Sequence, residues 1–173
     1  MFTVVRAPDN RLRVKTKPVK KISSALLQTL KEMIKTTLSF KDPEGVGLAA
    51  TQIGATERYF VGKIFGEVLK AFINPQITFY YKRTKKYFEG CLSIPNIWGE
   101  TVRSTMVKVA YQDTSGKQFN ETLKGVDAWI FQHEVDHLDG ILFPDRVLEQ
   151  KGKFYKFTGK DKAGGDIFQE ITI

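Results

Sequence analysis

The sequence predicts an α+β fold, because helical and β-rich stretches follow one another without regular alternation. Residues 25–38 carry apolar side chains at helical spacing, and Ser23 or Ser24 can cap the start of that helix. The middle of the chain is rich in β-branched and aromatic residues, and a second helical pattern follows at residues 124–139. Several predicted strands separate the two helical stretches. A doubly wound parallel sheet is therefore not expected.

The chain has 173 residues, close to the usual size of one domain, and no repeat, linker or low-complexity tract divides it. We therefore expect residues 1–173 to form a single domain. No segment approaches the roughly 18 unbroken apolar residues of a membrane span. The opening MFTVVRAPDN lacks the pattern of a signal peptide. These features predict a cytoplasmic protein of bacterial type that does not enter a membrane. They are equally compatible with an organelle or with the cytoplasm of a virus-infected host.

The first predicted helix has one apolar face, formed by Leu26, Leu27, Leu30, Met33, Ile34 and Leu38. Residues 45–54, GVGLAATQIG, contain too much glycine for a stable helix. We therefore expect a loop or a distorted strand whose backbone lies close to another group. Strands are predicted at residues 58–62, 70–74, 77–82 and 106–112. The turn DTSGK leads from the last of these into QFNETL, which predicts a hairpin. The last 30 residues, with KGKFYKF and DIFQEITI, are expected to be strands and loops.

The net charge of +8 favours anionic partners. Lysines gather at residues 15–21, 82–86 and 151–162, but no basic stripe with interleaved aromatic residues matches a nucleic-acid motif. We therefore expect no sequence-specific contact with nucleic acid. The charge predicts either an ordinary solvated surface or electrostatic docking to a body such as the ribosome.

The two histidines of the chain, His133 and His137, both lie in FQHEVDHLDG, residues 131–140. Side chains four apart lie above one another on a helix, so both imidazoles face the same point. Glu134 lies one step around the helix, where it can move a proton for a water held at a metal. The alternative is a pair of core histidines bonded to backbone carbonyls. Burying two imidazoles and a carboxylate on a face that includes Val126 costs free energy without partners, which favours a metal.

Two histidines leave a catalytic metal one protein ligand short. The downstream acids are one source of the third ligand: Asp139, Asp145, Glu149, Asp161, Asp166 and Glu170. The other source is Cys91, between Gly90 and Pro95, whose thiolate would complete a set with an open fourth position. A lone cysteine is more often a small buried apolar residue, so the residues alone leave the choice open.

Three segments, taken together, resemble the motifs of the peptide deformylase family. They are GVGLAATQIG (45–54), EGCLSIP (89–95) and QHEVDHLDG (132–140), and their order and spacing match as well. INP at 73–75 and PDNRLRVKTKPV near the N-terminus resemble the family's surrounding sequence. The resemblance runs to about Asp145. It implies strands wrapped around a central helix that carries HExxH and binds the metal, with an N-terminal helix beside them.

The resemblance also implies a reaction. Members remove the formyl group from the N-terminal formyl-methionine of nascent polypeptides and release formate. They use one divalent metal per chain, most often Fe(II), and Ni(II), Co(II) or Zn(II) can substitute. The implied metal ligands are Cys91, His133 and His137, with Glu134 as the general base and then the acid.

The remaining implied roles concern the substrate. Gln52 and the backbone N–H of Leu92 would stabilise the oxyanion that forms on the formyl group. Gly45, Val46 and Gly47 would lie along the peptide backbone, which would pair like an added strand. Trp129 and Ile130 lie one turn before His133, and we expect them to help form the pocket for the methionine side chain. Ordinary core packing is the alternative for these two residues.

The chain departs from the family pattern in two places. Bacterial members often carry an arginine a few residues after the proline of EGCLSIP, whereas here Trp98 falls near that place and Arg103 comes later. Several bacterial members end in a long basic helix. Here four glycines interrupt the tail, which favours a terminal strand in IFQEITI instead.

Two other classes share part of this pattern. A metallopeptidase or another amide hydrolase with HExxH would need a downstream Glu or His ligand and no role for Cys91. A protein with a structural metal would need four protein ligands and no role for Glu134.

Overall fold

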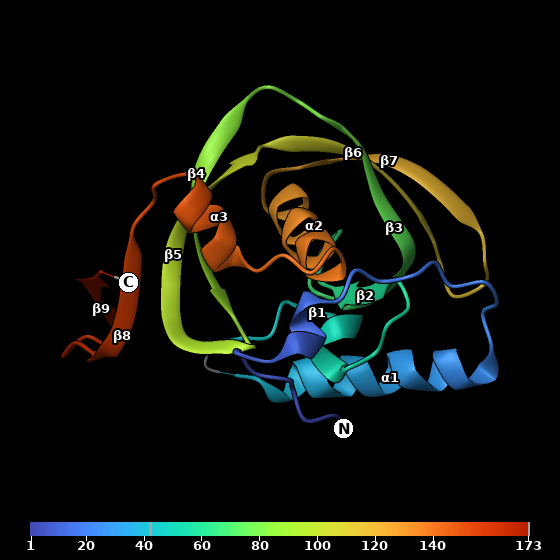
Figure 1. Ribbon diagram of the computed structural model, residues 1–173, viewed down its shortest axis with the longest axis horizontal. Helices are drawn as coiled ribbons and strands as arrows, with labels where there is room; N and C mark the ends of the chain where they lie inside the picture. Colours follow the sequence, from blue (N-terminus) through green and yellow to red (C-terminus); the bar gives the residue numbers. More distant parts are fainter. Residues whose placement is uncertain (42, 173) are drawn as a thin grey trace.

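The computed structural model describes residues 1–41 and 43–172, and this part of the chain forms helices and two antiparallel sheets (Figure 1). The mixture of helices and antiparallel strands confirms the predicted α+β class. Figure 1 shows α2 (Gly125–Leu138) inside the curve of the strands and α1 (Ser24–Ser39) along the outside. No helix in the described ranges is long and apolar enough to cross a membrane.

The larger sheet has five strands in the order β1-β2-β3-β6-β7. Their bounds are Gly47–Ala49 (β1), Tyr59–Gly62 (β2), Lys70–Tyr80 (β3), Met106–Gln112 (β6) and Gln118–Lys124 (β7). The predicted hairpin forms, because the carboxylate of Asp113 accepts from the backbone N–H groups of Ser115 and Lys117 in the turn. The two strands predicted at 70–82 are one, β3. Pro75 lacks an N–H, and the chain accommodates it with a register shift between Ile73 and Gln76.

The smaller sheet has four strands in the order β4-β5-β8-β9. Their bounds are Thr84–Cys91 (β4), Ile94–Ser104 (β5), Phe154–Lys160 (β8) and Asp166–Ile171 (β9). The strands expected in the tail are confirmed, although the last residue of IFQEITI, position 173, lies outside the described residues. The expectation of only strands and loops after residue 143 was wrong, because α3 (Phe143–Glu149) buries Phe143 and Val147 against this sheet.

Helix α1 begins as predicted, and Ser23 is its cap because its hydroxyl oxygen accepts from the N–H of Leu26 at 3.2 Å. The prediction that Leu38 belongs to the buried apolar face was wrong, since Leu38 is 48% exposed at the end of the helix. Thr36 and Thr37 are buried there instead. Their hydroxyls donate to helix carbonyls one turn earlier, which satisfies them without water.

Helix α2 packs between the sheets, and its buried side chains join the main core. Phe131 meets Phe60 and Phe72 edge to face, with ring centroids 5.2 and 5.8 Å apart. Val126 was predicted to lie on the buried face, but it is 58% exposed because it lies in the first turn, beyond the core. Residues 45–54, expected to be a loop or a distorted strand, form the short strand β1 and the 3₁₀ helix η2 (Ala50–Ile53).

Candidate active site

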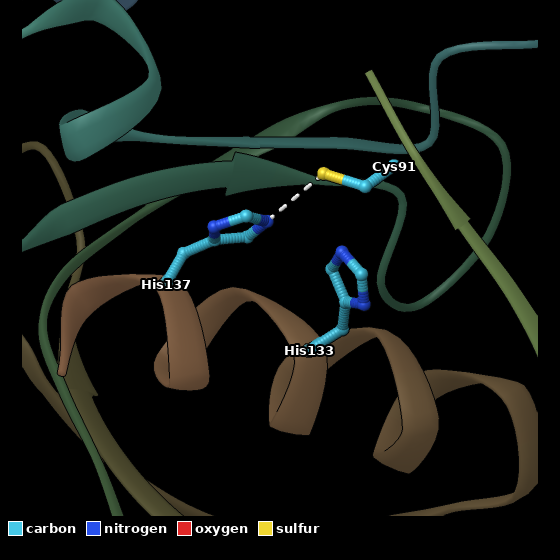
Figure 2. A group of neighbouring side chains, drawn as sticks. All are labelled: Cys91, His133 and His137. Carbon is cyan, nitrogen blue, oxygen red and sulfur yellow. Dashed lines mark hydrogen bonds between the residues drawn. The ribbon is translucent and has the colours of Figure 1, made fainter. Parts of the chain in front are cut away.

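Three side chains that bind transition metals converge between β4 and α2 (Figure 2). Cys91 ends β4, while His133 and His137 lie one turn apart on α2. Their ligand atoms all lie within 4.8 Å of one another, and Cys91 Sγ is 3.2 Å from His137 Nε2. Thiolate and imidazole are the donors that Fe, Co, Ni and Zn accept, so the group fits one such ion. Within the described ranges, the structure therefore brings Cys91 to the histidines rather than a downstream acid.

A buried ion-pair network holds His133. Its Nδ1–H donates to the carboxylate of Glu89 at 2.9 Å, and Glu89 is fully buried. Arg103 Nη2 donates to the same carboxylate at 2.9 Å, and Thr101 donates its hydroxyl proton to it. Arg103 also binds Asp136 at 2.8 Å. A carboxylate behind a metal-binding imidazole fixes the ring orientation and leaves the other nitrogen, Nε2, for the ion.

The electrostatic environment shifts the pKa values of the titratable groups of the site in different directions. Burial raises the pKa of Glu134 to about 7, which suits a group that must take and return a proton near neutrality. Burial and the neighbouring His133 hold the pKa of His137 well below its usual range, so its imidazole is neutral. Burial opposes the charge of Glu89, but the hydrogen bonds and charges of Arg103 and His133 together outweigh it and lower the pKa of Glu89. Glu89 therefore stays ionised while Glu134 can exchange a proton.

Glu134 is held against the backbone of β1. A Cβ added to Gly47 would overlap Glu134 Oε1, so only glycine leaves room for this carboxylate. The other oxygen, Oε2, is buried and has no hydrogen-bond partner among the described residues. His137 Nδ1 is likewise without one. Unpaired buried polar atoms are costly, and the unpaired Glu134 Oε2, in a side chain that lines the same pocket as Cys91 and His133, marks a site built for additional atoms.

Gln52 is fixed in η2 with its amide directed at the same point. Its Oε1 accepts from the N–H of Ala49 at 2.8 Å. Its Nε2 donates to Ser93 Oγ at 3.1 Å and approaches Cys91 Sγ at 3.5 Å. Leu92 follows Cys91 directly, in the turn between β4 and β5. The structure thus places the predicted oxyanion donors, Gln52 and the backbone of Leu92, beside the three ligand residues.

A pocket of about 230 Å³ opens next to these groups. Its walls include Val46, Gly47, Leu92, Trp129 and Ile130, together with Gln52, Cys91, His133 and Glu134. Trp129 stacks on Tyr87 with centroids 5.4 Å apart, which orients its ring. Gly45 lies outside the residues that line this pocket. A Cβ at that position would overlap the carbonyl of Thr37, so the packing of α1 already requires this glycine.

The sequence analysis assigned no role to Glu89 or Asp136. It noted Arg103 only as an arginine that lies further beyond the EGCLSIP segment than the arginine of the family pattern. Glu89 precedes Cys91 by two residues on one strand, so both side chains lie on the same face of β4. That spacing could have identified Glu89 as a partner of the site. The pairing of Arg103 with Glu89 depends on the β4–β5 register, which no local pattern reveals.

Comparison with known proteins agrees with this geometry. The family model for polypeptide deformylases matches residues 1–153. The peptide deformylase of Thermotoga maritima is 43% identical over 151 residues, which cover 87% of this chain and 90% of that protein. The crystal structure of a T. maritima peptide deformylase matches with a TM-score of 0.79 and 42% identity, covering 84% of this chain and 97% of that one. The Met-Ala-Ser-bound structure of a class I type b peptide deformylase from Acinetobacter baumannii has a TM-score of 0.77 and 30% identity, over 85% and 98% of the chains.

These matches run along most of the chain and include the strand and the helix that carry Cys91, His133 and His137. The chain therefore belongs to the peptide deformylase family.

Proposed function

We propose that this protein removes the formyl group from the N-terminal formyl-methionine of nascent polypeptides by hydrolysis at one divalent metal ion. Membership of the peptide deformylase family supports the reaction. The observation that carries the proposal is the convergence of Cys91, His133 and His137 within 4.8 Å, beside the buried carboxylate of Glu134. Cys91 Sγ and one nitrogen of each histidine would hold the ion and leave a position open for substrate. We propose Fe(II) as the native ion, with Ni(II), Co(II) or Zn(II) able to substitute.

The bound ion supplies a Lewis acid that polarises the formyl oxygen and lowers the pKa of water. Glu134 accepts the proton of the attacking water at its free Oε2 and later delivers it to the departing amine. Its pKa of about 7 allows both transfers near neutral pH. The Glu89 carboxylate keeps His133 in place during these transfers, because Arg103 and Thr101 hold it.

Two donors stabilise the oxyanion as the formyl carbon becomes tetrahedral. Gln52 is oriented before substrate arrives by its bonds to Ala49 and Ser93, so no reorganisation is required at the moment of reaction. The backbone N–H of Leu92 is the second donor. Removing one donor of this kind costs about 3–4 kcal/mol of transition-state stabilisation.

The peptide backbone would lie along β1. This strand is at the edge of its sheet and pairs with β2 on one side, so its other edge can accept an added strand. Residues 45–47 would follow the peptide, and Trp129 and Ile130 would receive the methionine side chain in the apolar pocket. The A. baumannii relative has a structure with Met-Ala-Ser bound, which supports a short peptide as the ligand.

The test is formate release from formyl-Met-Ala-Ser by protein loaded anaerobically with Fe(II) or reconstituted with Ni(II). Glu134→Ala and Cys91→Ala should each abolish release, whereas Asp127→Asn, a change of an acid on the same helix, should leave it intact. Release that survives Cys91→Ala would contradict the proposed ligand set. Cleavage of unformylated peptides without formate release would instead identify an HExxH metallopeptidase.

We propose further that residues 1–173 act as one catalytic domain in the cytoplasm and that the basic surface contacts the ribosome. The site combines side chains from η2, β4 and α2, which supports a single unit. The net charge of +8 supports contact with ribosomal RNA. Co-sedimentation with ribosomes should weaken steeply between about 50 and 200 mM salt. Absence of binding at low salt would contradict the ribosome contact.

A further inference from the structure

The C-terminal hairpin of β8 and β9 lies beyond the residues that the family model matches, which end at 153. It is nevertheless part of the sheet that carries Cys91. Strand β8 pairs with β5 through Ile97 with Lys156, Trp98 with Tyr155 and Gly99 with Phe154. In Figure 1 the hairpin lies on the outer side of β5, away from α2. It therefore extends the wall of the site outward rather than covering the catalytic groups.

Aromatic rings connect the hairpin to the site. Phe168 of β9 meets Phe88 and Trp98, with centroids 4.9 and 5.5 Å away. Trp98 in turn lies flat against Gly90, where an added Cβ would be 2.9 Å from its ring. Gly90 directly precedes Cys91. The hairpin thus fixes Trp98, which is the residue that departs from the family pattern, at the edge of the catalytic pocket.

A second hollow, of about 310 Å³, lies between the hairpin and the site. It shares four lining residues with the catalytic pocket: Pro43, Glu44, Cys91 and Trp98. The hairpin contributes Phe157 and Asp166, and Ile94, Pro95 and Ile97 make the rest of the wall largely apolar. The two carboxylates in the lining each have a lysine partner, Lys63 for Glu44 and Lys160 for Asp166. The hollow is therefore suited to an apolar side chain rather than to a charged one.

We propose that the hairpin forms the outer wall of a second peptide subsite, in which Phe157 contacts an apolar side chain downstream of the methionine. The inference rests on the proposed function. A peptide whose methionine occupies the catalytic pocket continues as an extended chain, with about 3.3 Å per residue. The residue two positions after the methionine is then about 7 Å further along, which suits the adjoining hollow. The occupant is thus the third residue of the same peptide, and the hairpin gives this enzyme a preference that the matched part of the chain does not encode.

The experiment compares kcat/KM for formyl-Met-Ala-Phe and formyl-Met-Ala-Ser with the metal-loaded full chain. The wild type should prefer the phenylalanine peptide, and Phe157→Ala should reduce the ratio on the order of tenfold, as expected for the loss of one sizeable apolar contact. Phe157→Leu should retain most of the preference. Ile167→Ala is the matched control, because Ile167 lies on β9 of the same hairpin but is exposed and lies outside the lining of the hollow. That variant should keep the wild-type ratio.

The outcomes separate the inference from the function on which it rests. An equal ratio in wild type and Phe157→Ala would overturn the subsite, and so would equal losses in Phe157→Ala and Ile167→Ala. The second result would mean that the hairpin acts only through packing. If the wild type released no formate from either peptide, the proposed function would fail and this inference with it.

Discussion

At the scale of single residues, Gly47 shows how the position of Glu134, the proposed general base, depends on a neighbour that lacks a side chain. An added Cβ at this position would overlap the carboxylate of Glu134, which is buried and cannot retreat into solvent. Gly47→Ala is therefore expected to displace Glu134 and to lower kcat by about a hundredfold, the usual cost of a misplacement near 1 Å. Steady-state formate release measures this loss, with circular dichroism to verify the fold.

Gly62→Ala is the matched control for this prediction, because Gly62 pairs with Gly47 across the β1–β2 ladder. A Cβ there meets the ends of the Phe60, Ile64 and Ile130 side chains, at 3.2 Å or more, rather than a catalytic group. Equal losses in both variants would show that strand packing, and not the position of Glu134, accounts for the effect.

Among the described residues the Glu89 carboxylate binds His133, Arg103 and Thr101, so we expect it to act on a bound metal through His133 rather than on substrate. Glu89→Gln keeps the size of the side chain but weakens its bond to the His133 Nδ1–H and to Arg103. Partners behind a ligand usually change metal affinity by about 10–100-fold, so a loss in this range is expected. Competition with a chromophoric chelator measures it. Glu100→Gln, on the neighbouring strand and paired with Lys86 at the surface, should bind metal like the wild type. Unchanged affinity in Glu89→Gln would show that the network only supports packing.

At the scale of elements, the predictable parts were those with a strong local pattern. Helices α1 and α2 and the hairpin of β6 and β7 combine regular spacing with a cap or a turn, and the structure confirms them. Strands β4 and β5 were missed. Polar residues and glycines interrupt their patterns, because part of each strand packs on the protein while part faces solvent. The partners of Glu89 are Arg103 of β5 and His133 of α2, so they follow from tertiary pairing and not from spacing along the chain.

Strand β2 carries a buried phenol whose titration makes stability depend on pH. Tyr59 is buried, and burial together with the charge of Glu57 raises its pKa to about 12. The unfolded chain ionises this phenol near its ordinary value of about 10. The stability that Tyr59 contributes is therefore complete below pH ~10 and is lost as the pH rises toward about 12.

Urea unfolding at pH 8 and at pH 11 tests this dependence. The wild type should lose more unfolding free energy between the two values than Tyr59→Phe, which has no phenol to ionise. Tyr81→Phe, at a half-buried position directly after β3, serves as the control and should behave like the wild type. Equal alkaline losses in wild type and Tyr59→Phe would contradict the role of the buried phenol.

At the scale of the whole molecule, the site combines segments that are far apart along the chain. Gln52 comes from η2, Cys91 from the end of β4, and His133 and His137 from α2. The unfolded chain does not hold these groups together, so an ion that binds them binds the folded state selectively. Metal binding must then stabilise the entire fold and not only its immediate surroundings.

Metal removal should consequently lower the melting temperature. A free Ni(II) concentration of 100 times the dissociation constant adds about 2.7 kcal/mol to the unfolding free energy. For a domain of this size each kcal/mol shifts Tm by about 2–4 °C, so the metal-free protein should melt about 5–11 °C below the loaded one. Calorimetry of both forms measures this difference. Glu134→Gln should retain it, since Glu134 is not a ligand, whereas His137→Ala should lose most of it. A shift that persists in His137→Ala would mean that the ion stabilises the fold from somewhere other than the Cys91, His133 and His137 group.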